Sequence, residues 1–143
     1  MMGRAAGDAG PIGVTEVHTT ASALAIPAIR AVAVDLAARV DFDLDSIDDL
    51  RMAVDDTCAR LVRLAASNAT LSCSFAVHFE RIELTAEVEV EDMMDPLPRG
   101  SFGWWVLQCL ADEVTALVLP GEPGHGGRVC IILIKNALTP GLA

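Results

Sequence analysis

Basic residues are scarce in this 143-residue chain, and long apolar runs are missing. Ten Lys and Arg residues stand against twenty Asp and Glu residues, giving a formal net charge of -10. This surplus argues against direct binding to nucleic acid or to an anionic membrane, because both attract positive charge. No apolar run approaches the roughly 20 residues of a membrane span, and the N-terminus lacks the apolar segment of a signal peptide. We therefore expect a cytoplasmic protein that binds other proteins.

Cysteine spacings typical of metal sites are also missing. Cys58, Cys73, Cys109 and Cys130 lie far apart in the chain, and none falls in a Cys-x-x-Cys or Cys/His ligand pattern. Each lies in an apolar pattern, which is typical of reduced core cysteines. We expect no metal site and no disulfide.

The length is that of one domain with a proper core. Residues 1–13 are rich in Gly and Ala and predict a disordered leader. Residues 14–136 then form the single domain, and residues 137–143 form a tail.

The clearest helical pattern covers residues 46–66, where apolar residues recur on one face and Ser46 is the expected N-cap. Asp56 and Arg60 lie four residues apart at the border of this apolar face, so the helix brings them side by side. From the residues alone, they are either an exposed ion pair worth about 0.3–0.5 kcal/mol or part of a pocket.

Strict alternation of apolar and polar residues over 70–79 and 82–90 predicts an antiparallel hairpin with one wet face. The remaining patterns predict strands over 14–20, 113–119 and 128–135, and helices over 27–40 and 104–112. This order predicts an α+β two-layer sandwich, with helices on one face of a mostly antiparallel, mixed sheet. The last strand is apolar on both faces, so we expect it to be central or covered by another subunit.

Two local patterns and the order of elements resemble a known family. The central helix contains LRMAVDDTCARLVRLA, which is similar to an N-box helix, and RGSFGWWVLQCLADEV is similar to a second glycine box. Together they resemble the anti-sigma factors of the serine-protein-kinase type, which share the histidine-kinase-like ATPase fold. The resemblance covers residues 14–135 and is closest to the actinobacterial, including mycobacterial, branch.

The resemblance implies a degenerate nucleotide site. Asp56 takes the place of the general base, and Arg60 replaces the Asn that holds Mg²⁺ against ATP, although a guanidinium cannot coordinate a cation. Asp92 stands where an Asp-x-Gly-x-Gly box would bind adenine, but no glycine follows it. Gly100 and Gly103 retain a helix start whose N–H groups suit phosphate. We therefore expect ATP and Mg²⁺ binding to be lost or much weakened.

Simpler structural explanations exist for the same residues. Gly100 and Gly103 suit a turn and close packing at the start of a helix. Arg30, which the resemblance places in contact with the sigma factor and its antagonist, is otherwise a solvated helix arginine.

The resemblance implies a homodimeric anti-sigma factor. Such a protein sequesters an alternative, stress-type sigma factor and is released by an anti-anti-sigma (STAS-type) protein. One alternative is an ATP-dependent serine-protein kinase that phosphorylates this antagonist. Another is a degenerate scaffold or decoy that keeps the fold and binds neither sigma factor nor nucleotide.

Overall fold

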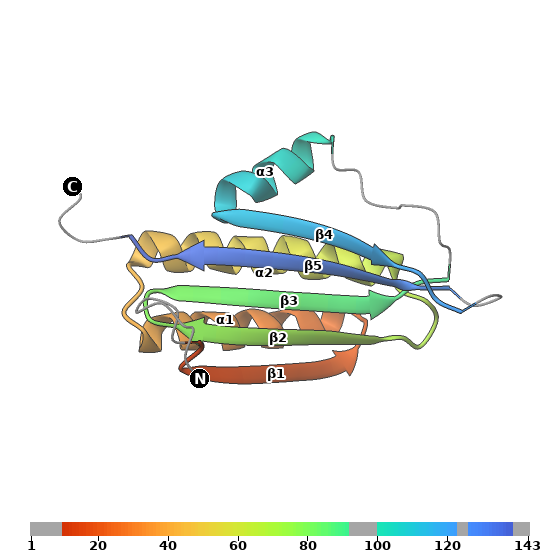
Figure 1. Ribbon diagram of the computed structural model, residues 1–143, viewed down its shortest axis with the longest axis horizontal. Helices are drawn as coiled ribbons and strands as arrows, with labels where there is room; N and C mark the ends of the chain where they lie inside the picture. The colour runs from red at the N-terminus through yellow and green to blue at the C-terminus, as the bar shows by residue number, and fades with distance from the viewer. Residues whose placement is uncertain (1–9, 92–99, 123–125, 139–143) are drawn as a thin grey trace, which may run out of the picture.

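The structure is a computed structural model that describes residues 10–91, 100–122 and 126–138. Its elements are β1 (Gly13–Thr20), the short 3-10 helix η1 (Ala23–Ala25), α1 (Ile26–Arg39), α2 (Leu44–Leu64), β2 (Thr70–His78), β3 (Arg81–Glu89), α3 (Phe102–Leu110), β4 (Glu113–Leu119) and β5 (Arg128–Asn136). The strands form one sheet in the order β1-β2-β3-β5-β4. Figure 1 shows α1 and α2 against one face of this sheet, with α3 beyond the edge strand β4.

The predicted α+β architecture and the predicted order of elements are confirmed. All four strand pairings among the described residues are antiparallel, whereas the sequence predicted a mostly antiparallel, mixed sheet. No helix in the described part of the chain is long and apolar enough to cross a membrane.

The β2–β3 hairpin shows why alternation predicts strands well. Phe75 and Leu84 are paired across the two strands and are fully buried under the helices. Their neighbours Ser74 and Thr85 form the next pair on the opposite face of the sheet. The predicted inward position of Phe79 is wrong. It lies exposed in the turn, next to Glu80 with φ of 60°, because the chain leaves the strand after His78.

The central position of β5 explains why it is apolar on both faces. It pairs with β3 on one side and with β4 on the other. Ile131 and Leu133 face the core and are buried, whereas Ile132 and Ile134 on the other face are half-buried. The strand was expected to be either central in the sheet or covered by another subunit. Its central position is enough to explain why both of its faces are apolar.

Helix α2 begins one turn earlier than predicted. Its N-cap is Asp43, whose Oδ2 accepts a hydrogen bond from the Ser46 N–H at 3.0 Å. Ser46, the predicted cap, is buried inside the first turn. Asp41 has φ of 59°, and this left-handed residue reverses the chain just before the cap. Both Asp and Ser are good caps, so the sequence alone did not separate them.

The ends of the predicted domain differ slightly from the observed elements. Ile12 donates its N–H to the Val77 carbonyl at 2.6 Å, so pairing with β2 starts before the predicted boundary at Val14. Leu138 donates its N–H to Asp43 Oδ1 at 3.1 Å, which ties the chain after β5 to the start of α2. Most of the predicted leader (1–9) and tail (139–143) lies outside the described residues.

The Asp43 cap makes a testable contribution to acid stability. Hydrogen bonds from Ser46 and from the Leu138 backbone lower the pKa of Asp43 from 3.8 to about 2. A carboxylate with a lowered pKa stabilises the fold above its unfolded pKa, and this contribution is lost as pH falls from about 4 towards 2. Asp43→Asn keeps an acceptor but does not titrate, so its urea midpoint should fall less than that of the wild type over this range.

Asp45→Asn is the matched control, because Asp45 is an exposed acidic residue in the same first turn of α2. This variant should lose stability with the same slope as the wild type. Equal slopes for Asp43→Asn and the wild type would show that the cap makes no pH-dependent contribution.

Candidate functional site

The predicted pair Asp56 and Arg60 meets where α2 contacts α3. Arg60 Nε donates to Asp56 Oδ2 at 2.6 Å. Arg60 is only 8% exposed, whereas the Asp56 side chain is 37% exposed. The pair is therefore not the fully exposed one considered from the sequence, because its cation is buried. A buried cation must keep its partners, since removing them leaves an uncompensated charge.

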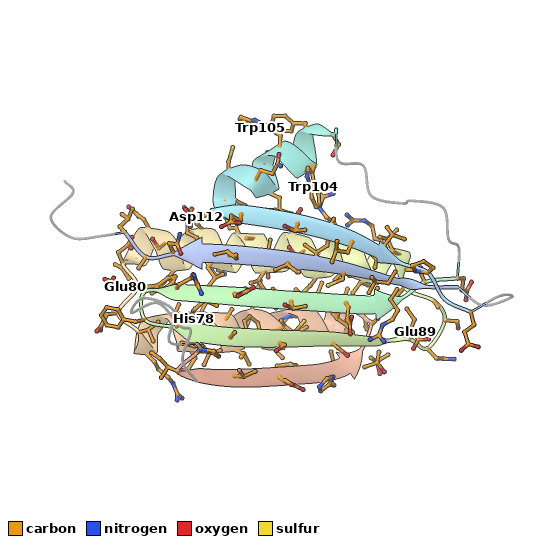
Figure 2. The ribbon with its side chains drawn as sticks, in the orientation of Figure 1. His78, Glu80, Glu89, Trp104, Trp105 and Asp112 are labelled. Carbon is orange, nitrogen blue, oxygen red and sulfur yellow. The ribbon has the colours of Figure 1, made fainter. Side chains whose placement is uncertain are left out.

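Trp104 is the second partner of the Arg60 guanidinium. The guanidinium carbon lies 5.5 Å from the centroid of the Trp104 ring. Trp104 is 4% exposed, and Figure 2 shows it pointing from α3 toward the sheet. A cation over a tryptophan face contributes about 2 kcal/mol when both groups are desolvated. Arg60 is thus held by one carboxylate and one aromatic ring from two different helices.

Gly103 gives the guanidinium its space. A Cβ at this position would lie 2.8 Å from Arg60 Nη2, which is too close for a real contact. The helix start itself is capped by Ser101, whose Oγ accepts the Trp104 N–H at 3.1 Å. Gly100 differs, since a Cβ there would meet no atom within 4 Å. Of the two predicted glycines, Gly103 lies against Arg60 and Gly100 does not.

The charge of this site does not favour a metal cation such as the Mg²⁺ that accompanies ATP. The N-terminus of a helix carries a partial positive charge and stabilises anions. Here the Arg60 guanidinium, a second positive group, packs against the first turn of α3 and is offset by Asp56. Arg60 also has no lone pair with which to hold Mg²⁺. The residues present therefore do not fit Mg²⁺ and ATP in the way that the family resemblance implies.

Asp92, the residue expected near adenine, lies outside the described residues. Within the ranges that the structure describes, no group of three or more His, Cys, Asp or Glu side chains could hold a metal ion.

Arg30, the predicted partner contact, lies on α1 and is tied to α2. Its Nη1 donates to Asp55 Oδ2 at 2.9 Å, and both side chains are about one-third exposed. The second oxygen, Asp55 Oδ1, is buried and has no hydrogen-bond partner in the described part of the chain. No local sequence pattern predicted this pair, because 25 positions separate its members. Arg30 is therefore both positioned within the fold and partly accessible to a partner.

Three of the four cysteines lie in the core as predicted, and Cys109 does not. Cys58, Cys73 and Cys130 are buried, whereas Cys109 is exposed on α3. The prediction failed there because α3 is apolar on its outer face as well as its inner face. A hydrogen bond with Cys73, together with burial, raises the pKa of the Cys58 thiol well above its usual range. Cys58 is thus a protonated core residue and not a nucleophile.

The contact between Gly103 and Arg60 can be tested with a double-mutant cycle. In the wild type, Gly103→Ala makes the guanidinium shift against Asp56 and Trp104, which should cost about 1 kcal/mol. In an Arg60→Gln background the shorter side chain leaves room. There the same change should stabilise α3 by up to about 1 kcal/mol, because Ala is the better helix former. Urea unfolding of the four proteins measures both free energies.

Gly100→Ala is the control, since open space surrounds that position. It should change the free energy of unfolding by less than about 0.5 kcal/mol. The same effect of Gly103→Ala in both backgrounds would show that Arg60 does not occupy the space beside the glycine.

Comparison with known proteins gives two results. No family model matches the chain. It is, however, similar to the anti-sigma-F factor RsbW of Mycobacterium tuberculosis, in the strains CDC 1551 and H37Rv, with 37% identity over 91 residues. The aligned part covers 62% of this chain and 52% of each relative, so the chain spans about half the length of the curated relatives it matches. The resemblance found in the sequence is thereby confirmed, and this chain is similar to the anti-sigma factors of the RsbW type.

Proposed function

We propose that this protein is an anti-sigma factor that acts by binding. In this proposal it sequesters an alternative, stress-type sigma factor and is released by an anti-anti-sigma protein of the STAS type. The similarity to RsbW supports the class of partner. The observation that supports the mode of action is the Arg60 guanidinium packed against the start of α3, because a guanidinium cannot be the metal ligand that the family resemblance implies at this position. Sequestration requires a complementary surface and no chemistry.

The charge of the chain suits this partner. Sigma factors present basic surfaces that contact DNA, and this protein carries a formal net charge of -10. Opposite potentials speed association and make it sensitive to ionic strength. The acidic protein would compete for the same basic groups that otherwise contact phosphate.

Homodimer formation is part of the proposal. Leu117 and Leu119 on β4 are exposed on the outer face of the sheet, next to the half-buried Ile132 of β5. An apolar surface on an outer sheet face supports association between two copies. The cytoplasmic location and the stress-type role stay predictions.

The second candidate is a serine-protein kinase that phosphorylates the antagonist. One observation favours it: the Asp56 carboxylate is partly exposed beside the start of α3, where the resemblance places a general base. Against it, the Asp56 carboxylate is paired with Arg60. A metal ligand would have to replace that arginine. We therefore place the kinase second to the binding function.

Calorimetric titration with ATP separates the two candidates. The wild type should give no Mg²⁺-dependent heat, because Arg60 occupies the site and cannot coordinate the metal. Arg60→Asn removes the guanidinium and supplies an amide oxygen, so any remnant of the nucleotide site should appear in this variant first. GTP and metal-free runs are the controls. Micromolar, Mg²⁺-dependent binding of ATP to the wild type would favour the kinase instead.

Arg30 provides a test of sigma-factor binding with a matched control. The alternative sigma factors of the same genome are purified one by one, and the affinity of each for this protein is measured. If Arg30 contacts the partner, Arg30→Gln should weaken the complex about tenfold, that is by about 1.4 kcal/mol. Asp55→Asn breaks the same internal ion pair but keeps the guanidinium, so it should weaken the complex much less.

Equal losses in the two variants would show that Arg30 acts only within the fold. Failure of the wild type to bind any of these sigma factors would overturn the proposed function.

A further inference from the structure

Helix α3 carries apolar residues on both of its faces, and Gln108 is its one polar side chain. Its sequence, FGWWVLQCL, contains no charged residue. Trp104 and Leu107 are buried on the inner face, whereas Phe102 and Trp105 are 77% and 58% exposed on the outer face. Figure 2 shows Trp105 pointing away from the rest of the molecule. A helix that is apolar all round is normally buried on all sides. The outer face of α3 therefore lacks the cover that its sequence predicts.

The two exposed rings form a ready-made contact surface. The Phe102 and Trp105 ring centroids lie 5.8 Å apart with an interplanar angle of 30°. Aromatic side chains in contact with each other have few rotamers to lose on binding, and aromatic residues dominate the energetic centres of protein interfaces. Exposed Cys109 continues the same stripe, seven residues after Phe102. We call Phe102, Trp105 and Cys109 the outer face of α3.

The charged residues in the segment that holds α3 and β4 are all acidic. The described segment 100–122, which holds α3 and β4, contains Asp112, Glu113 and Glu122 and no Lys or Arg. Asp112 and Glu113 follow the C-terminal end of α3 directly and are exposed. A complementary partner would present apolar side chains bordered by basic ones. The nine residues of α3 extend over about 13 Å, which matches two to three turns of a partner helix.

We propose that the outer face of α3 is a docking surface for a basic amphipathic helix of the protein partner. The identity of that partner as a sigma factor rests on the proposed function, whereas the chemistry of the surface rests on α3 itself. Apolar side chains of the partner helix cover the two exposed rings, and its Lys and Arg side chains lie beside Asp112 and Glu113. This surface is distinct from Arg30, which lies on α1.

Tryptophan fluorescence tests the surface directly. The chain has two tryptophans, and Trp104→Phe leaves Trp105 as the reporter. The probe is a synthetic helical peptide of Leu and Lys, and the control peptide has Glu in place of each Lys. The Lys peptide should shift the Trp105 emission to the blue and protect it from iodide, whereas the Glu peptide should do neither. Should Trp104→Phe not fold, the wild type serves, because Trp104 is only 4% exposed to the quencher.

A matched pair of variants localises the binding. Phe102→Ser should weaken binding of the Lys peptide about tenfold or more. Phe79→Ser removes a phenylalanine that is equally exposed, 78% against 77%, but lies in the β2–β3 turn, and it should leave binding unchanged. Equal effects of the two variants, or equal binding of both peptides, would overturn the proposal. The proposal would also be overturned if iodide did not quench Trp105 in the free protein. Protection of Trp105 from iodide as the protein concentration rises without peptide would overturn it as well, because a second copy of the chain would then cover the surface.

Binding of the sigma factor separates this inference from the proposed function. A weaker complex with Phe102→Ser and an unchanged one with Phe79→Ser would support both. A complex that tolerates both changes would overturn the α3 surface and leave the anti-sigma function intact. Binding of the Lys peptide without binding of any sigma factor would support the surface and overturn the function.

Discussion

The position of α3 depends on one buried cation. The Arg60 guanidinium reaches from α2 to the first turn of α3, where Asp56 accepts its hydrogen bond and Trp104 covers its face. Burying a charge is costly unless its partners are kept, so this contact fixes the two helices relative to each other. The same contact explains the glycine at position 103, because any side chain there would displace the guanidinium. A residue that looks like part of a phosphate loop is thus explained by packing.

Two consecutive acidic residues make α2 the connection between the other helices. Asp55 is bonded to Arg30 of α1, and Asp56 is bonded to Arg60 on the side of α3. Successive residues of a helix point about 100° apart, which directs the two carboxylates to different neighbours. The start of α2 is joined to the chain after β5 through Asp43. Disturbing α2 would therefore reach α1, α3 and the end of the sheet together.

The sequence predicted the elements well and the long-range contacts poorly. Alternation placed the β2–β3 hairpin, and helical spacing brought Asp56 to Arg60, because both patterns are local. The pairing of Arg30 with Asp55 and the stacking of Arg60 on Trp104 depend on how helices pack, which spacing does not record. In α3 both faces are apolar, so periodicity could not tell that Cys109 would be exposed. At the start of α2, both Asp43 and Ser46 are good capping residues, and the structure uses Asp43.

The Arg60 contacts and the exposed rings are consistent with one mode of action. In a site built for a nucleotide, the ligand itself would stabilise the neighbouring helix. Here the Arg60 contacts hold α3 from within the chain, so its outer face is presented without any ligand. Exposing Phe102 and Trp105 to water contributes little to the stability of the fold, because the gain from apolar surface requires its burial. That gain becomes available when a partner covers them. A protein that acts by binding would use its aromatic residues in this way, whereas a kinase would need a metal ligand at the position of Arg60.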